Sequence, residues 1–404
     1  MKWEKVKLGD VCEITSSKRI FYSEYVDDGV PFYRSKEIIE SDEGKIIENP
    51  LYISVDKYNE IKEKFGVPET GDMLLTSVGT IGIPYIIKKK DCFYFKDGNL
   101  TWFRDFREGL NSKYLYYWIK SSEGTGTLYN TTIGSSQKAL TISALKNIKV
   151  LLPPRSVQDK IVEVVSVYDD LIENNQKQIK LLEEAAQRLY KEWFVDLRFP
   201  GHENTKIVDG VPEGWNICPF SSKVDIMSGG TPKTSIPDYY NGRIPFYTPK
   251  DSDGAFFAYK TQMNITEGGL KNCNSRLYPP KTVIITARGT VGKTTILAVS
   301  MAMNQSCYAL KMKENDAPYY LFFALNNEIK ALQTMANGGV FNTIIGKTFD
   351  SINIQIPKDP LIYGFEETVR PFMEQIKNKL QANSKLVEAR NRLLPKMMSG
   401  EVEA

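Results

Sequence analysis

The sequence has few residues of the kinds that perform catalysis at neutral pH. It contains a single histidine, His202, which lies in a polar stretch. The sequence has no Gly-x-Ser-x-Gly motif for a nucleophilic serine and no His-Glu-x-x-His motif for a metal. It also has no glycine-rich strand-to-helix turn followed by an acidic residue, the pattern typical of nucleotide binding. A chain without these patterns is expected to recognise a partner rather than to catalyse a reaction.

Cysteine is also sparse, and its spacing suits neither cross-links nor a metal. The cysteines are scattered and form no Cys-x-x-Cys pair: Cys12, Cys92, Cys218, Cys273 and Cys307. Zinc sites and disulfide frameworks need ligands or partners at recognisable short spacings. We therefore expect no disulfide, no metal and no cofactor in this chain.

Long hydrophobic runs are missing. The longest, such as Ile142–Pro153, fall far short of the roughly 20 residues that a membrane span needs, and Met1–Asp10 is too polar for a signal peptide. These absences predict a cytoplasmic protein without membrane contact. The formal net charge is only +3, which permits a nucleic-acid partner without indicating one.

The first half of the chain is repeated in the second half. From Gly134, which matches Gly338, the two copies align without a gap as far as Arg188 and Arg392. Further words recur in the same order: Trp3 and Trp215, Pro31-Phe32-Tyr33 and Pro245-Phe246-Tyr247, Thr76–Gly82 and Thr286–Gly292, and Tyr114–Tyr117 and Tyr320–Phe323. Ordered repetition on this scale predicts a tandem duplication.

Each copy ends in a long amphipathic stretch. Apolar residues recur at spacings of three and four, which predicts a coiled-coil seam. The seam positions are Ile161, Val165, Tyr168, Ile172, Asn175, Ile179, Leu182, Ala186 and Leu189 in copy one, and Val369, Met373, Ile376, Leu380, Asn383, Val387 and Leu394 in copy two. Two such helices, each roughly 45 Å long at 1.5 Å per residue, are expected to pair within the chain as an antiparallel coiled coil.

Two asparagines, Asn175 and Asn383, occupy seam positions. A polar seam residue commonly fixes the register of a coiled coil at some cost in stability. The alternative interpretation is that these positions lie at partly exposed helix ends.

The pattern predicts an α+β fold, with two mixed α/β domains joined by the two long helices. Within each domain, short β-branched and aromatic runs such as Met73–Ser77 alternate with turn signals around one helical patch. The expected boundaries are a domain at 1–154, a helix at 155–195, a linker at 196–212, a domain at 213–358, a helix at 359–396 and a tail at 397–404.

One word nearly matches a nucleotide-binding pattern. Ala287–Thr294 resembles a P-loop, but alanine replaces its first glycine. The equivalent Ser77–Pro84 of copy one has neither the lysine nor the following hydroxyl residue. We therefore interpret both segments as paired Gly-Thr-x-Gly loops, which are either tight structural turns or contacts to phosphate groups.

Side chains around these loops and around the Pro-Phe-Tyr words are the candidates for a nucleic-acid surface. These side chains differ between the copies, as expected if each copy recognises a different nucleic-acid sequence. The candidate residues are Tyr33, Arg34, Lys36, Ser77, Gly79, Thr80, Gln137 and Lys138 in copy one, and Tyr247, Lys250, Arg288, Gly289, Thr290, Lys293, Asn342 and Thr343 in copy two.

Taken together, the chain resembles the specificity subunit of Type I restriction-modification systems. In that family each recognition domain starts at a tryptophan and ends in a proline-rich word, as at Trp3 and Leu152-Pro153-Pro154. The words Leu189–Gly201 and Leu393–Glu401 after the helices look like family signatures. The Glu-Gln that usually follows the proline-rich word is Val157-Gln158 in copy one and has no counterpart near Pro357.

The resemblance implies a non-catalytic subunit that binds double-stranded DNA at an asymmetric, bipartite target. It implies two target-recognition domains, two bound methyltransferase subunits and, through them, the restriction subunits. S-adenosylmethionine, ATP and magnesium would then belong to the partner subunits. The alternative is a coiled-coil scaffold whose globular ends bind protein.

Overall fold

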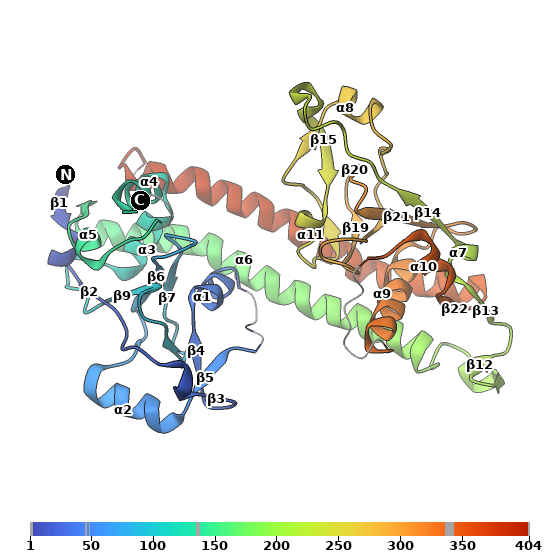
Figure 1. The fold of residues 1–404 in the computed structure, drawn as a ribbon, viewed down its shortest axis with the longest axis horizontal. Coiled ribbons are helices and arrows are strands. Elements are labelled where there is room, and N and C mark those ends of the chain that lie inside the picture. The colour runs from blue at the N-terminus through green and yellow to red at the C-terminus, as the bar shows by residue number, and fades with distance from the viewer. Residues whose placement is uncertain (1–2, 45–46, 48, 135–137, 336–342, 403–404) are drawn as a thin grey trace. The chain divides into compact units, whose positions relative to one another are not determined.

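The computed structural model describes residues 3–44, 47, 49–134, 138–335 and 343–402 and divides them into two compact units. Unit 1 is formed by Met1–Gln176 with Asn383–Ala404, and unit 2 by Lys177–Ala382. Each unit contains part of both long helices, α6 (Arg155–Tyr190) and α11 (Asp359–Met398), drawn in green and red in Figure 1. Within the described residues, no helix is both long and apolar enough to cross a bilayer.

Unit 1 is built on two small sheets and a set of helices. The first sheet is antiparallel and has the order β2 (Glu13–Thr15), β9 (Leu100–Arg104), β6 (Met73–Thr76) and β7 (Pro84–Ile86). The second has the order β3 (Tyr25–Val26), β5 (Leu51–Ile53), β4 (Val30–Tyr33) and β8 (Tyr94–Phe95). The helices are α1 (Ser35–Asp42), α2 (Val55–Phe65), α3 (Ser112–Lys120), α4 (Ser122–Thr131) and α5 (Ile142–Lys146).

Unit 2 also has two sheets and a set of helices, but its sheets contain five and three strands instead of four each. Its larger sheet has the order β14 (Val224–Ser228), β21 (Cys307–Met312), β18 (Val283–Thr286), β19 (Thr294–Leu297) and β16 (Phe257–Ala258). The smaller has the order β17 (Asn264–Ile265), β15 (Tyr240–Tyr247) and β20 (Ala302–Met303). The helices are α7 (Phe220–Lys223), α8 (Glu267–Lys271), α9 (Pro318–Met335) and α10 (Gly346–Asp350).

A strand pair closes each unit next to its long helix. In unit 1, β10 (Lys149–Leu152) runs antiparallel to β1 (Glu4–Lys7), and in unit 2, β22 (Asn353–Ile356) runs antiparallel to β13 (Asn216–Pro219). Burial alternates along both β10 and β22, as expected for a strand with one face on a core. The chain therefore enters each long helix from the same kind of two-stranded element.

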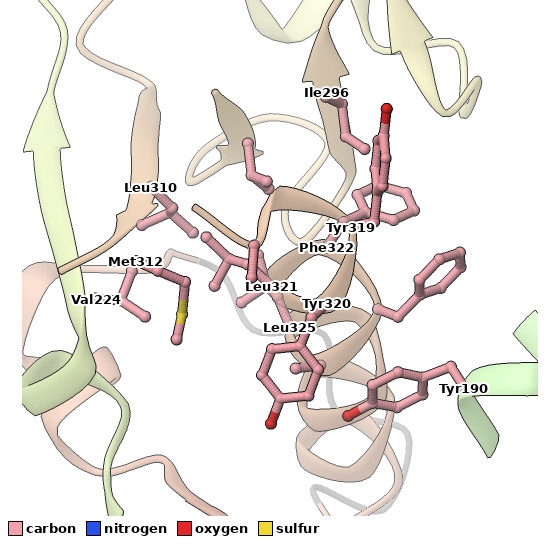
Figure 2. Packing of buried hydrophobic residues seen from close by; sticks show 14 of the residues in the cluster. Tyr190, Val224, Ile296, Leu310, Met312, Tyr319, Tyr320, Leu321, Phe322 and Leu325 are labelled. Carbon is pink, nitrogen blue, oxygen red and sulfur yellow. The ribbon is translucent and has the colours of Figure 1, made fainter. Parts of the chain in front are cut away.

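The core of unit 2 surrounds the aromatic helix α9. Its described N-terminal part is apolar on nearly every side, which is typical of a helix inside a domain. Figure 2 shows Leu321 and Leu325 of this helix beside Leu310 and Met312 of β21, with Tyr190 of α6 approaching from the other direction. In unit 1, α3 takes the same place and buries Tyr114, Leu115 and Trp118.

The long helices pack against each other antiparallel within each unit. In unit 1, Leu394 near the end of α11 shares a core with Ile161 near the start of α6. In unit 2, Val369 near the start of α11 shares a core with Ala186 near the end of α6. The fold class predicted from the sequence, two α+β units of one duplication with paired antiparallel helices, is confirmed.

Predicted seam positions lie on the inner sides of these helices. Ile161, Val165, Ile179, Ala186, Val369, Met373, Ile376 and Leu394 are buried, and Tyr168, Ile172, Asn175, Leu182, Leu189, Leu380, Asn383 and Val387 are partly buried. In unit 1, Asn175 Nδ2 donates a hydrogen bond of 2.8 Å to Asn383 Oδ1. The two asparagines are therefore partners across the helix pair, which supports the register interpretation over exposed helix ends.

The predicted linker, 196–212, contains a hairpin that the sequence analysis did not predict. The end of the predicted helix, Lys191–Val195, forms a π-helical turn after α6, and within the linker β11 (Ile207–Val208) pairs with β12 (Val211–Pro212). Asp209 and Gly210 at its turn have φ of 50° and 79°. An Asp-Gly pair between β-branched residues is a recognised hairpin signal, so this element was readable from the sequence.

Candidate nucleic-acid interface

The Gly-Thr-x-Gly loops connect antiparallel strands in both units. The loop of unit 1 joins β6 to β7, and the loop of unit 2 joins β18 to β19. A P-loop instead joins a strand to a helix, whose N-terminus holds the phosphate. Ala287–Thr294 therefore resembles a nucleotide-binding motif in sequence but not in structure, as the comparison with Ser77–Pro84 predicted.

The two loops share one backbone conformation. Gly79 and Gly82 have φ of 79° and 85°, and Gly289 and Gly292 have φ of 82° and 83°. These values lie in the left-handed region, which glycine adopts without steric cost. The glycines of the repeated word are therefore required by the turn itself.

A buried threonine closes the base of each loop. Thr76 Oγ1 accepts a hydrogen bond of 2.9 Å from Ile83 N–H, and Thr286 Oγ1 accepts one of 3.1 Å from Lys293 N–H. Thr286 Oγ1 also donates to Thr290 O. The first threonine of the word is thus structural, whereas Thr80 and Thr290 at the tips are exposed.

A second segment lies against each loop. In unit 1, Leu140 N–H donates to Ser77 O at 2.9 Å, and in unit 2, Ile344 N–H donates to Ala287 O at 2.9 Å. These bonds place Lys138 beside the loop of unit 1 and Thr343 beside the loop of unit 2. The structure therefore brings together candidate residues that are far apart in the sequence.

The surface beside the unit 1 loop includes an aromatic residue that the sequence analysis missed. Tyr129 of α4 is 62% exposed, and Lys138 Nζ lies 3.6 Å from the centroid of its ring. The neighbouring Leu128 is buried, and its Cδ1 lies 3.4 Å from where a Cβ on Gly82 would stand. Gly79, Thr80, Tyr129 and Lys138 therefore belong to one exposed surface, named here the unit 1 tip.

The corresponding surface of unit 2 is more basic. Thr290 Oγ1 donates to Pro249 O at 3.3 Å, which joins the loop to the turn that carries Lys250. Arg288, Lys250 and Lys293 are exposed, and within the described part of the chain none of them forms an ion pair. We name Lys250, Arg288, Thr290 and Lys293 the unit 2 tip.

Lys293 also lies at the edge of a cavity of about 710 Å³ inside unit 2. The residues that line it include Glu184 and Arg188 of α6 together with Phe256 and Phe322. The cavity mixes an acid with bases, and the described residues contain no cluster of three metal-ligating side chains anywhere. The cavity therefore offers polar contacts of both charge signs.

Two of the predicted contact residues are wrong because they are buried. The Ser77 side chain is only 2% exposed, and its hydroxyl lies 2.7 Å from the Thr101 hydroxyl. Tyr247 is 1% exposed, and burial raises the pKa of its phenol. Both side chains are buried and present almost no surface to a ligand.

The remaining candidates have mixed surroundings. The Tyr33 ring stacks on Phe93 with centroids 4.3 Å apart. Arg34 donates to Glu37 Oε1 at 2.6 Å at the start of α1, and this carboxylate raises the pKa of the Arg34 guanidinium. Lys36 is exposed with Glu40 3.7 Å away. Gln137 and Asn342 lie outside the described residues.

Comparison with known proteins gives a consistent result. A family model described as the Type I restriction modification DNA specificity domain matches residues 1–184 and 212–381. The MjaIX specificity subunit of a Type I restriction enzyme, from Methanocaldococcus jannaschii, is 27% identical across 99% of this chain and 93% of that protein. The HindI specificity subunit from Haemophilus influenzae is 24% identical across 65% of this chain and 71% of that protein.

A solved structure shares the fold. The S subunit of a Type I restriction-modification system from M. genitalium covers 98% of this chain and 96% of its own, with a TM-score of 0.59 and 15% sequence identity. The likeness spans both units and both long helices.

Proposed function

The chain belongs to the family of Type I restriction-modification DNA specificity proteins, and from this premise we propose that it is the DNA-recognition subunit of such a complex. The observation that carries the proposal is the pair of tips. Their loops have the same glycine conformations, but their exposed side chains differ. An invariant scaffold with two different surfaces suits a target with two different halves.

The two tips differ in the groups that they offer to a ligand. Both tips present a threonine hydroxyl. The unit 1 tip adds an aromatic ring and one ammonium group, whereas the unit 2 tip adds a guanidinium and two ammonium groups. Arginine forms bidentate contacts with guanine, and lysine provides contacts to phosphate. We assign Arg288 to base reading, and Lys138, Lys250 and Lys293 to the backbone.

The proposed geometry relies on the helices as a spacer. The α6 helix has 36 residues and is roughly 54 Å long, which corresponds to about 1.6 turns of B-DNA at about 34 Å per turn. The target would then consist of two short half-sequences separated by bases that are not read. A palindromic target would count against the proposal because the two tips are not alike.

We assign catalysis to partner subunits. The described residues hold no group of metal ligands, and α6 carries an exposed apolar row that suits a protein partner: Val164, Val167, Leu171 and Leu181. Two methyltransferase subunits would bind along the helix pair, and restriction subunits would bind through them. S-adenosylmethionine, ATP and magnesium would be held by those subunits.

The test is methylation mapping with the assembled complex. Arg288→Ala is expected to relax or abolish recognition at one position of one half-sequence and to leave the other half unchanged. One bidentate base contact contributes about 1–3 kcal/mol of discrimination, or about 5- to 150-fold. Lys385→Ala, which removes an exposed charge from α11, is the matched control and should change no base.

Phosphate binding has a separate signature. Lys250→Ala should leave the methylated sequence unchanged but make the slope of log affinity against log salt shallower by about 0.9 for each phosphate that is no longer neutralised. If the complex bound DNA without salt dependence, the assignment of these lysines would fail. If the chain bound no DNA in the complex, the scaffold alternative would replace the proposal.

A further inference from the structure

A polar cluster connects three helices in unit 1. Asp169 of α6 forms an ion pair with Arg390 of α11, and Asp169 Oδ2 accepts a hydrogen bond of 2.7 Å from the Tyr117 hydroxyl of α3. The Arg390 and Asp169 side chains are only 18% and 28% exposed. Each group therefore depends on the other for charge compensation, since a shielded charge without a partner is costly.

The equivalent positions of unit 2 hold no polar group. The duplication aligns Asp169 with Met373, Arg390 with Ala186 and Tyr117 with Phe323. All three apolar counterparts are buried in one cluster, at 0%, 0% and 3% exposure. The same meeting point of three helices is therefore ionic in unit 1 and hydrophobic in unit 2.

A second contact differs in the same way. Asn175 and Asn383, which are hydrogen-bonded in unit 1, align with Lys379 and Ile179. The helix pair thus has two directional polar contacts in unit 1 that cannot form at the aligned positions of unit 2. Such contacts contribute little net stability but strongly disfavour arrangements in which one partner is missing.

The apolar seams alone would not tell the two helices apart. Since α6 and α11 arose by duplication, α6 of one chain could pair antiparallel with α6 of a second copy. Leu182 and Leu386 are identical at equivalent places, as are Arg188 and Arg392. In that pairing Asp169 would face Ala186 of the second copy, and Asn175 would face Ile179 of the second copy, so both would lose their polar partners.

We propose that the Asp169–Arg390–Tyr117 cluster and the Asn175–Asn383 pair select the partner of α6, admitting α11 and rejecting the α6 of a second copy. The ion pair is the stronger selector because it carries charge. Because of this ion pair, α6 is complementary to α11 but not to a second copy of α6. This inference concerns chain pairing and does not depend on DNA recognition.

The selection can be rewritten in the full-length chain. Asp169→Arg places two guanidinium groups opposite each other within one chain, and Arg390→Asp does the same with two carboxylates. A chain carrying Asp169→Arg and a chain carrying Arg390→Asp satisfy both pairs only by exchanging helices with each other. In that mixed dimer the introduced arginine meets the introduced aspartate, and the native Asp169 of one chain meets the native Arg390 of the other.

The experiment co-expresses the two variants with different affinity tags and measures co-purification and mass. We expect at least tenfold more of the second tag than for wild type with itself or for either variant with itself. The double variant D169R/R390D restores the pair within one chain and should return to the wild-type level. If single variants are insoluble alone, recovery of soluble protein on co-expression is the readout.

Two outcomes would overturn the proposal. One is mixed-tag recovery no higher than that of Asp169→Arg with itself, and the other is a double variant that exchanges as freely as the mixed pair. A merely stabilising ion pair would lower the melting temperature of the single variants without producing mixed dimers. Lys88 and Glu173 provide the control, because their ion pair joins α6 to the β7–β8 loop and not to α11. Co-expressed K88E and E173K chains should not co-purify.

Discussion

Unit 1 and unit 2 cap their equivalent aromatic helices, α3 and α9, with different chemistry. In unit 1, Gln158 of α6 accepts from Asn111 N–H at 2.9 Å and donates to Gly109 O and Pro153 O at 2.8 and 2.9 Å. In unit 2, Glu366 of α11 accepts from Tyr320 N–H at 2.7 Å. Both side chains are buried. An amide satisfies donors and acceptors without charge, whereas a carboxylate at such a place must either be desolvated or hold a proton.

Both units therefore kept a buried hydrogen-bond acceptor for an N–H group at the start of this helix, but the residue that provides the acceptor differs. Gln158 and Glu366 are not equivalent in the ungapped alignment, and Glu366 lies one helical turn further along its helix. What is common is an orphan N–H at the start of an aromatic helix that packs on the long helix. The consequence differs, because only unit 2 links its stability to pH through this cap.

The largest expected effect tests whether the units are independent. Phe365→Ala removes a ring that contacts Tyr190 and Phe194 in unit 2, and we expect a loss of about 3–5 kcal/mol in unfolding free energy. The equivalent Ile161→Ala should cost unit 1 about 2–5 kcal/mol. Hydrogen exchange should show lost protection only in the altered unit.

Exposed Tyr363 is the control, and Tyr363→Ala should stay within about 0.5 kcal/mol of the wild type. Equal loss of protection in both units after Phe365→Ala would mean that they unfold together, which would contradict the prediction that the units are independent.

The next effect concerns pH. Burial raises the pKa of Glu366 to about 7, above its ordinary value. The folded state therefore holds a proton that the unfolded state releases, so the contribution is present below the ordinary glutamate pKa and is lost as pH rises through about 7. Burial also raises the pKa of Glu183 in unit 2 to about 7. Denaturation of the wild type between about pH 4.5 and about pH 8 should therefore show a decline in unit 2 that Glu366→Gln reduces by about 3 kcal/mol without abolishing it.

Unit 1 provides the reciprocal variant. Gln158→Glu should introduce the same kind of decline in unit 1, where none arises from this position in the wild type. A Glu366→Gln chain whose unit 2 loses as much stability over this range as the wild type would show that Glu366 is not responsible.

The smallest effect lies at the loop bases. Thr76→Val and Thr286→Val each leave a loop N–H without its acceptor, and we expect losses of about 1 kcal/mol. The loss should be the larger at Thr286, whose hydroxyl also donates to Thr290 O. Thermal unfolding should show this order, and exposed Thr80→Val should leave the midpoint unchanged. The reverse order would show that the two loops are held differently despite their equal glycine conformations.

The sequence predicted the long-range features of the fold because they leave periodic signals. The duplication, the helices at 155–195 and 359–396 and their antiparallel pairing follow from spacing and repetition alone. The short strands of each domain carry no such information about which strands pair. Sheet order depends on contacts between residues that are far apart in the chain.

The candidate site was only partly predictable. Ser77 and Tyr247 were misplaced because β6 and β15 end in a core, and a short apolar run does not reveal whether its last side chain is buried. Tyr129 was missed because α4 contains Gly124 and Gly126, which weaken any helical pattern in the sequence. Its position beside the loop depends on packing through Leu128, which no motif records.

The last turns of α11 complete unit 1 and not the unit that precedes them in the sequence. Leu394, Met397 and Met398 share a core with Leu8, and Gly400 lies against the ring of Trp3. During translation, a ribosome makes the whole of unit 2 between these two groups of residues. We therefore expect unit 2 to finish folding before unit 1. Until the end of α11 is synthesised, the apolar face of α6 in unit 1 would be exposed and accessible to chaperones.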